Sequence, residues 1–430
     1  MKKEWNDLLN MLNCSVSPYH TIQEVMRQLE ETGAKELKAK EVWKTEAGRM
    51  YYVNIYGTTL VAFHIHENPD AEDGFRIGIA HTDWPCLRIK PNPDMTAGGY
   101  RKLNVEVYGG PILATWLDRP LSIAGRVTLK GDSIFAPKER LIDFKRPVVT
   151  IPNVAIHMNR EANSGYKWNA QTDMLPILGF VTDKLENENY FLNVLAKELG
   201  VEVDHILDYD LYIYNAEQAS IIGMDEDMIS APRLDNLTSC QACLHGLLNG
   251  KRKNGVDVIA LFDNEECGSR SKQGANGEMF AHILEKLALS LGWSREQYLA
   301  KLFGSFIISA DVAHAIHPNH PEKCDVTNKP AMNAGFCIKM ESNQRYATDG
   351  SAVAVVEELC KKNQIRYAKF ANRSDIPGGG TIGSILSSFI PAKTIDVGIP
   401  LLAMHSAREL MAADSQCQLN ALFQAFFTEE

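Results

Sequence analysis

The stretch VDVIALFDNEECGS, residues 256–269, decides the fold, because it joins an apolar segment to an acidic loop. A short apolar run bounded by polar residues and glycine is typical of a strand in the core of a sheet. In open α/β sheets, functional groups gather where such strands end. Glu265 and Glu266 lie in this loop. One could bind a metal while the other handles a proton, and a solvated pair at a loop tip is the plainer alternative.

Composition limits the class of protein. The chain has 430 residues, of which 45% are hydrophobic and 23% charged, with a net charge of −10 and a pI near 5.7. This is ordinary globular composition, and the length suggests roughly two or three domains. An acidic chain lacks the basic character of a phosphate-backbone binder, so we expect no nucleic-acid partner.

Two further features bear on location. The first residues, MKKEWNDLLNML, contain no continuous apolar stretch, and no run of about 18 apolar residues follows, so we expect neither a signal peptide nor a membrane span. Nine scattered cysteines favour reduced thiols in the cytoplasm. Cys240 and Cys243 form a C-x-x-C in a helical segment, for which packed thiols are favoured over a redox or zinc site.

The order of predicted elements indicates an α/β fold interrupted by a β-rich insertion. We assign residues 1–95 and 230–430 to an α/β catalytic domain and residues 96–229 to the inserted domain, where short alternating strands, Pro and Gly prevail. Helices are predicted at 22–29, 191–200, 277–292, 351–363 and 407–427, and residues 234–250 are predicted to form a loop followed by a helix that ends at Gly250. Strands are predicted at 51–57, 58–66, 75–81, 256–262 and 305–311, and residues 393–406 are predicted to form one strand or two.

Five candidate metal ligands lie at the ends of predicted strands, with Asp235 in the loop APRLDNL: His81, Asp235, Glu266, Asp311 and His405. Two imidazoles and three carboxylates suit a pair of borderline divalent ions such as zinc. Paired ions need one bridging carboxylate, for which Asp235 is the natural candidate. Glu265 would then serve as general base for an attacking water. Asp83, two residues after His81, could hold that imidazole. Since carboxylates at strand ends are common, the spacing of these residues does not by itself establish a metal site.

Other histidines have plainer explanations. His64 and His66 alternate on one strand face and are more often surface or half-buried groups than ligands. His314, His317 and His320 have a three-residue spacing, but Pro318 interrupts a helix there, so structural roles are favoured.

Ordered motifs along almost the whole chain resemble the aspartyl aminopeptidase family of dinuclear zinc exopeptidases, which also includes vacuolar leucine-type aminopeptidases. The motifs are SPYHTIQEVMRQLEETGAKEL (17–37), AHTDWPCLRIKP (80–91), YGGPILATWLDRPLSIAGRV (108–127), IPNVAIHMNR (151–160), APRLDNL (231–237), DNEECGS (263–269), SADVAHAIHPNH (309–320), IKMESNQRYAT (338–348) and DVGIPLLAMHSARE (396–409).

The resemblance implies a mixed-sheet α/β/α zinc-exopeptidase domain with an inserted β-rich oligomerisation domain. It matches His81, Asp235, Glu266, Asp311 and His405 to the ligands of two Zn²⁺ per subunit, with Mn²⁺ or Co²⁺ as alternatives. Glu265 matches the general base and Asp83 the acid that supports the first histidine. His157 matches a residue that reaches a neighbouring active site, and Lys339 and Tyr346 match substrate-pocket residues. The implied assembly is a tetrahedral homododecamer.

We therefore predict a cytoplasmic metalloaminopeptidase acting on peptides, with an acidic first residue favoured because of Lys339. A neutral, leucine-like preference, another dinuclear zinc hydrolase such as a deacylase or carboxypeptidase, and a non-catalytic scaffold are the alternatives. Two positions depart from the family pattern. Trp84 stands where a small residue is usual, which bears on side-chain preference, and Cys267 replaces a valine.

Overall fold

The computed structural model describes residues 2–71, 74–181 and 189–430. The chain forms two compact units. The first contains residues 1–83, 219–404 and 409–430, and the second contains residues 84–218 and 405–408.

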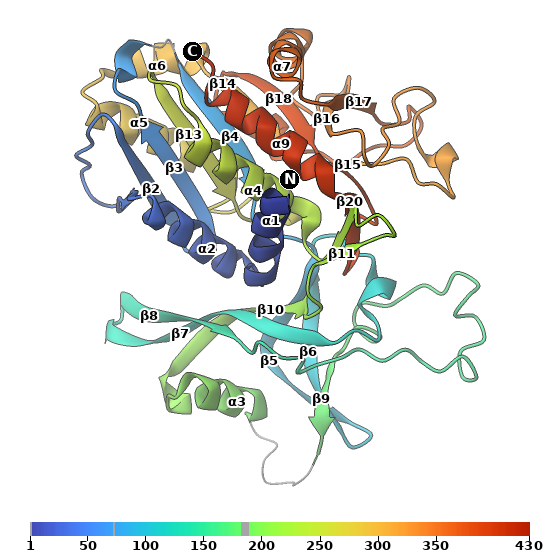
Figure 1. The fold of residues 1–430 in the computed structure, drawn as a ribbon. Coiled ribbons are helices and arrows are strands. Elements are labelled where there is room, and N and C mark those ends of the chain that lie inside the picture. Colours follow the sequence, from blue (N-terminus) through green and yellow to red (C-terminus); the bar gives the residue numbers. More distant parts are fainter. Residues whose placement is uncertain (1, 72–73, 182–188) are drawn as a thin grey trace. The chain divides into compact units, whose positions relative to one another are not determined.

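A nine-stranded mixed sheet is the centre of the first unit (Figure 1). Its strands lie in the order β1 (Lys35–Glu36), β2 (Arg49–Ile55), β3 (Thr59–Ile65), β13 (Val256–Phe262), β4 (Phe75–His81), β14 (Phe306–Ala310), β18 (Lys393–Gly398), β16 (Phe336–Met340) and β17 (Tyr367–Ala371).

The middle of this sheet is parallel. β13 pairs in parallel with β4, β4 with β14, and β14 with β18. All seven residues of β13 are buried. The carboxyl ends of these strands therefore meet at one edge of the sheet, where the register places Phe262 opposite His81.

Helices cover both faces of the sheet (Figure 1). Apolar side chains of α5, α6 and α8 join those of the sheet in one core cluster. On the other face, a Cβ on Gly78 of β4 would lie 2.8 Å from the ring of Phe423 in α9, so glycine allows close packing there. The helices of this unit are α1 (Lys2–Cys14), α2 (Pro18–Glu31), α4 (Leu234–Asn249), α5 (Met279–Ser290), α6 (Arg295–Gly304), α7 (Gly350–Asn363), α8 (Ile382–Leu386) and α9 (Ala413–Phe426).

Local sequence explains where helix α2 begins and which of its faces is buried. Ser17 is its N-cap and accepts the backbone N–H of His20, while Pro18 occupies the first turn. Ile22, Val25 and Leu29 recur at helical spacing and are buried.

A smaller five-stranded sheet completes the first unit. Its order is β11 (Ser220–Ile222), β12 (Met228–Ala231), β20 (Glu409–Ala412), β19 (Pro400–Leu402) and β15 (Ala313–His314).

The second unit is built on one antiparallel sheet. Its order is β8 (Ala136–Asp143), β7 (Leu121–Ser133), β10 (Ile206–Asn215), β5 (Cys86–Ala97), β6 (Tyr100–Tyr108) and β9 (Ile177–Phe180), with α3 (Tyr190–Leu199) beside it.

The mixed α/β class is as predicted, with differences at boundaries. The insertion was expected over residues 96–229, whereas the second unit begins at residue 84. The reason is that β5, which starts at Cys86, pairs with β6 and β10. The helix predicted for 407–427 is wrong at its start, since residues 409–412 form strand β20 between β12 and β19. α1 was not predicted.

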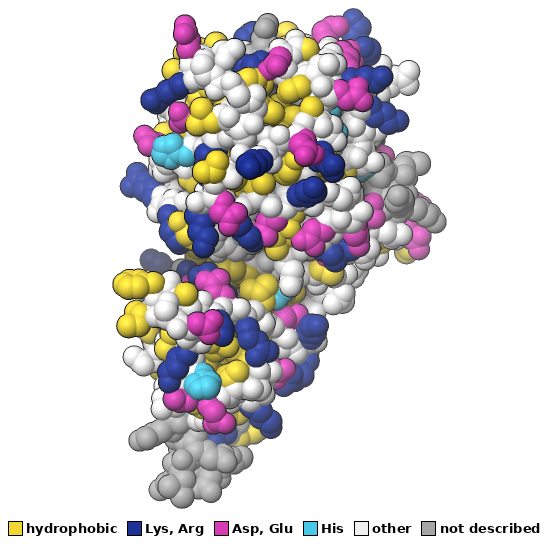
Figure 2. Space-filling view, turned by 90° about the vertical axis from the view of Figure 1, so that its left-hand side faces the viewer, with side chains coloured by type: hydrophobic (Ala, Val, Ile, Leu, Met, Phe, Trp, Pro, Cys, Tyr) yellow, Lys and Arg dark blue, Asp and Glu magenta, His cyan; other side chains and the backbone are white. Residues whose placement is uncertain are grey.

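The surface drawn in Figure 2 carries Lys and Arg side chains interspersed with Asp and Glu. Mixed charge of this kind differs from the basic face that a nucleic-acid backbone requires. Among the helices that the structure describes, none combines the length and apolar character needed to cross a membrane.

Candidate metal centre

The carboxyl ends of three parallel strands bring most of the predicted ligands to one edge of the main sheet. His81 is the last residue of β4, and Asp311 follows β14 directly. Glu266 lies in the short 3₁₀ turn Glu265–Cys267 after β13. Asp235 lies at the start of α4.

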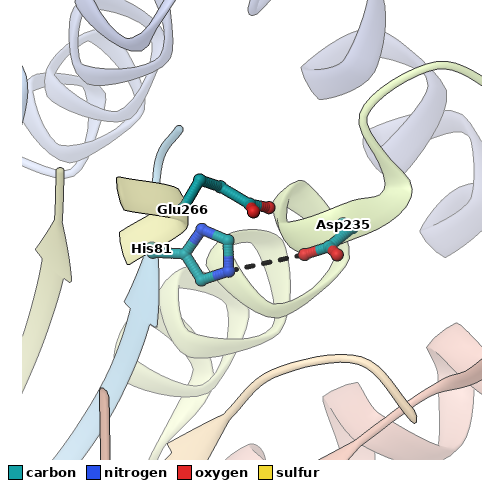
Figure 3. A group of neighbouring side chains, drawn as sticks. All are labelled: His81, Asp235 and Glu266. Carbon is teal, nitrogen blue, oxygen red and sulfur yellow. Dashed lines mark ion pairs between the residues drawn. The ribbon is translucent and has the colours of Figure 1, made fainter. Parts of the chain in front are cut away.

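These side chains form a compact group. One ligand atom each from His81, Asp235 and Glu266 lies within 4.8 Å of the others (Figure 3). The Nε2 atom of His81 is 3.4 Å from Oδ1 of Asp235 and 3.6 Å from Oδ1 of Asp311. The structure thus brings together four of the five predicted ligands.

The donor atoms fit zinc. An imidazole nitrogen with carboxylate oxygens is a usual ligand set for Zn²⁺. Burial lowers the pKa of His81, but hydrogen bonds from its ring to Asp235, Asp311 and Asp83 outweigh burial, and the net pKa lies well above 6.5. A bound dication would replace the proton that the surrounding carboxylates favour.

Asp83 organises two parts of the centre at once. Its Oδ1 and Oδ2 atoms each accept a backbone N–H at 3.1 Å, from Glu265 and Glu266 respectively. The Nδ1 atom of His81 lies 3.1 Å from the Asp83 carbonyl and 3.4 Å from its carboxylate. A held Nδ1 leaves Nε2 facing the other carboxylates, which is the arrangement of a histidine ligand supported by a carboxylate.

Burial and neighbouring carboxylates disfavour the charged forms of Glu265 and Glu266. The pKa of Glu265 is raised to about 8, chiefly by burial; His81 opposes this shift, while Asp311, Asp83 and Asp235 contribute to it. Burial and Asp235 raise the pKa of Glu266 well above its usual value. Clustered, desolvated carboxyl groups of this kind mark functional sites, and cations relieve their repulsion.

Asp235 is held by residues that the sequence did not single out. Its N–H donates to Oε2 of Glu409 at 3.1 Å, and the next side chain, Asn236, donates to the carbonyl of Ala310 at 2.8 Å. The Asp235–Asn236 peptide bond is cis. No local signal in the sequence predicts the contact of Glu409, because 174 positions separate it from Asp235.

Cys240 also supports the centre. Its thiol donates to the carbonyl oxygen of His81 at 3.0 Å, and both Cys240 and Cys243 are buried free thiols in α4. Burial raises the pKa of the Cys240 thiol to about 12. This is the packed-thiol arrangement that the sequence favoured.

Lys339 and Tyr346 lie beside Asp311 and are both 3% exposed. The Nζ atom of Lys339 is 3.5 Å from Oδ2 of Asp311 and 4.7 Å from the ring centroid of Tyr346. Burial lowers the pKa of Lys339, but Asp311 and Tyr346 outweigh it, so the net pKa is raised and the ammonium stays charged. The hydroxyl of Tyr346 accepts from Asn372 at 3.1 Å.

Two predicted site residues belong to the second unit. His405 is half-buried, and its Nδ1 atom is 3.0 Å from the carbonyl oxygen of Gly110. His157 is exposed in a turn. Trp84, the departure noted in the sequence, is also in this unit and is buried.

Other histidines make contacts of their own. His66 is buried in an ion pair with Asp257, whose carboxylate also contacts Arg252. His314, His317 and His320 line a cavity of about 550 Å³.

Comparisons with known proteins identify the family of the chain. The model of the family described as aminopeptidase I zinc metalloprotease (M18) matches residues 11–427. A relative from Clostridium novyi (strain NT), named probable M18 family aminopeptidase 2, is 46% identical over 423 residues, covering 98% of each chain.

Two solved structures have a similar fold. The Ape4 chain in a complex with Nbr1, solved by cryo-EM, has a TM-score of 0.95 and 32% identity, covering 99% of this chain and 85% of that one. The mApe1 dodecamer of S. cerevisiae has a TM-score of 0.86 and 28% identity, covering 99% and 97%. The chain therefore belongs to the M18 family of zinc metalloproteases, the aminopeptidase I and aspartyl aminopeptidase-like enzymes.

Proposed function

We propose that this aminopeptidase hydrolyses the first peptide bond of its substrates at a dinuclear zinc centre with Glu265 as general base. The observation that carries the proposal is the grouping of His81, Asp235 and Glu266 ligand atoms within 4.8 Å of one another, next to Glu265. A metal-dependent exopeptidase needs a metal centre and a proton acceptor side by side, and this turn offers a predicted ligand and a predicted proton acceptor as adjacent residues.

The proposed ligands of the two ions are His81, Asp235, Glu266, Asp311 and His405, with Asp235 shared. When bound, zinc supplies Lewis acidity that polarises a carbonyl group and lowers the pKa of water. Mn²⁺ and Co²⁺ accept the same kinds of ligand.

Glu265 provides the proton transfer. Its carboxylate takes a proton from the attacking water and delivers it to the leaving amine. Asp83 assists because it accepts the N–H of Glu265 and so limits where that residue's backbone can lie. Glu265 has a raised pKa among protein groups alone, and cations at this site would lower that pKa and so leave the carboxylate available as a base.

The preference for the first residue stays a prediction. An acidic side chain was predicted from Lys339, and a neutral one is the alternative. His157, Lys339 and Tyr346 are the predicted substrate contacts.

The proposed assembly is a homo-oligomer, with twelve subunits in tetrahedral arrangement and the inserted unit pairing subunits. The solved mApe1 relative is a dodecamer. The inserted unit here exposes apolar side chains that need a partner, with Ile134 93% and Phe135 99% exposed between β7 and β8. We also propose a cytoplasmic location, because the nine cysteines are scattered along the chain and the C-x-x-C pair, Cys240 and Cys243, consists of buried thiols.

A substrate panel tests the proposed activity. Amide substrates with Asp, Glu, Leu or Lys as the first residue are incubated with enzyme loaded with zinc, manganese or cobalt, each with and without an acetylated amino terminus. We expect cleavage only of free amines, with Asp and Glu fastest. Equal cleavage of acetylated substrates would indicate a deacylase or carboxypeptidase, and no cleavage with full zinc content would indicate a scaffold.

A further inference from the structure

The acidic loop, residues 263–269, is held by hydrogen bonds that the ligand assignment does not use. Asn264 and Ser269 both have left-handed backbone angles, with φ of 65° and 61°, and the N–H of Ser269 donates to the Asn264 carbonyl at 2.7 Å. Residues other than glycine rarely adopt this conformation unless neighbouring groups hold it. The groups that hold this loop therefore determine where Glu265 and Glu266 lie.

Thr59 is one of these groups. It is the first residue of β3 and is fully buried. β3 pairs antiparallel with β13, with Leu60 opposite Leu261, so the start of β3 lies beside the end of β13. The preceding turn, at Tyr56 and Gly57, has positive φ at both residues, which is the conformation of a tight hairpin. The hairpin therefore sets which residue of β3 lies next to the acidic loop.

The hydroxyl of Thr59 joins the acidic loop to the segment that follows it. The hydroxyl accepts the N–H of Asp263, the first residue of the loop, at 2.9 Å, and it donates to the carbonyl oxygen of Gln273 at 2.8 Å. A threonine hydroxyl has one hydrogen to donate and two acceptor positions, so it can make both contacts at once. Loss of this buried hydroxyl would leave the Asp263 N–H and the Gln273 carbonyl without this partner.

Asp263 and Gln273 also contact each other. The Oδ2 atom of Asp263 accepts from the side-chain amide of Gln273 at 3.3 Å, and its Oδ1 atom accepts the N–H of Asn264 at 2.7 Å. Asp263 is only 2% exposed, so these hydrogen bonds form away from solvent. Thr59, Asp263 and Gln273 therefore form a closed set of contacts where the acidic loop begins.

We infer that Thr59 is a positioning residue, whose hydroxyl fixes the acidic loop so that Glu266 can bind zinc and Glu265 can take a proton from water. Asp83 holds the backbone N–H groups of the two glutamates, whereas Thr59 holds the residue at which the loop begins. The inference rests on the roles proposed above for Glu265 and Glu266. A buried threonine that only stabilises the fold would instead lower stability without changing zinc affinity.

The test compares Thr59→Val and Thr59→Ser with the control Thr21→Val in the full-length chain. Valine has nearly the shape of threonine but no hydroxyl, whereas serine keeps the hydroxyl. Thr21 in α2 is also fully buried, and its hydroxyl donates to the carbonyl oxygen of Ser17 at 3.2 Å. Thr21→Val therefore removes a buried hydrogen bond of the same kind from the first turn of a helix.

Zinc affinity is measured by competition with a chromogenic chelator, kcat on a substrate that wild type cleaves, and stability by urea unfolding. We expect Thr59→Val to bind zinc about 10-fold more weakly, because the groups that orient ligands have effects of this size. At saturating zinc its kcat falls about 10-fold, because the base is displaced from the water. Thr59→Ser stays close to wild type in both. Thr21→Val loses stability but keeps wild-type zinc affinity and kcat.

Wild-type zinc affinity and kcat in Thr59→Val would overturn the inference. Equal losses in Thr59→Ser would also overturn it, because the hydroxyl would not be the cause, and so would equal losses in Thr21→Val. If Thr59→Val does not accumulate as folded protein, Thr59→Cys decides between the same outcomes, since a thiol is a weaker hydrogen-bonding group. If the wild-type chain binds zinc but cleaves no substrate, the proposed function fails, and the zinc measurements still test the role of Thr59.

Discussion

Single hydrogen bonds to the ligand residues determine how the centre is built. Asp83 holds His81 and the backbone of the Glu265–Glu266 pair, and Glu409 holds the backbone of Asp235. Partners of this kind orient the ligands before a metal binds, and their loss commonly reduces metal affinity or activity.

Substitution of Glu409 tests whether such a hydrogen bond positions a ligand residue. Glu409→Ala removes the acceptor of the Asp235 N–H and leaves that buried donor without its partner. We expect zinc affinity to fall about 10-fold or more, measured by chelator competition. Glu409→Gln keeps an acceptor oxygen and should retain more affinity than alanine. Equal affinity in wild type and Glu409→Ala would show that this contact does not position Asp235.

Strand β13 of the main sheet carries the candidate metal centre at one end and a second buried group of charged side chains near the other end. The metal centre lies at the carboxyl end of β13, whereas Asp257 near its start contacts His66 and Arg252. His64 is the register partner of Asp257 and is half-buried, with its ring centroid 4.2 Å from that of His66. Burial, followed by repulsion from His66, lowers the pKa of His64 to about 4, while Asp257 opposes this shift.

This shift predicts a pH dependence of stability. The unfolded state takes up a proton on His64 near pH 6.5, and the folded state does so only near pH 4. Stability is therefore complete above pH 6.5 and is lost as pH falls towards 4. Because His64 is partly solvated, we expect about 1–2 kcal/mol from this group. Urea unfolding of His64→Gln between pH 7 and 4 should show a shallower decline than wild type, and the exposed control His282→Gln should not.

The elements were largely predictable where pattern and burial agree. β13 occupies the same residues, 256–262, as the predicted strand, and the helix predicted within 234–250 corresponds to α4 (Leu234–Asn249). Buried apolar runs and helical spacing carry this information locally. Strand β20 was missed because its residues continue a helical pattern, and only its pairing with β12 and β19 makes them extended.

The residue types of the candidate site were predictable from the sequence, but the residues that hydrogen-bond to the candidate ligands were not. The strand-end pattern, with the family resemblance, gave His81, Asp235, Glu266 and Asp311, and the structure groups them. Contacts such as Glu409 to Asp235 join residues far apart in the chain and depend on the pairing of β20 with β12, the strand that precedes α4. For Lys339, the sequence supplied a charge, whereas its burial beside Asp311 comes only from the fold.

For the whole molecule, the proposed oligomer explains the exposed apolar tip of the inserted unit. Hairpin residues Ile134 and Phe135 are almost fully exposed, and burying such a side chain contributes about 1.5–3 kcal/mol. We expect Ile134→Ser/Phe135→Ser to lower the assembled mass measured by light scattering. Val42→Ser, a change at a 94% exposed position in the first unit, is the control. An unchanged mass in the double variant would place the subunit contacts elsewhere.

We propose that one acidic turn supplies both a metal ligand, Glu266, and a separate proton acceptor, Glu265. The most direct measurement is zinc content and kcat for Glu265→Gln beside wild type, on a substrate that wild type cleaves. Since the amide cannot take a proton, we predict a loss of kcat of about 10²–10⁴-fold or more with the zinc content of wild type retained. Activity near that of wild type, with the zinc still bound, would show that Glu265 is not the proton acceptor.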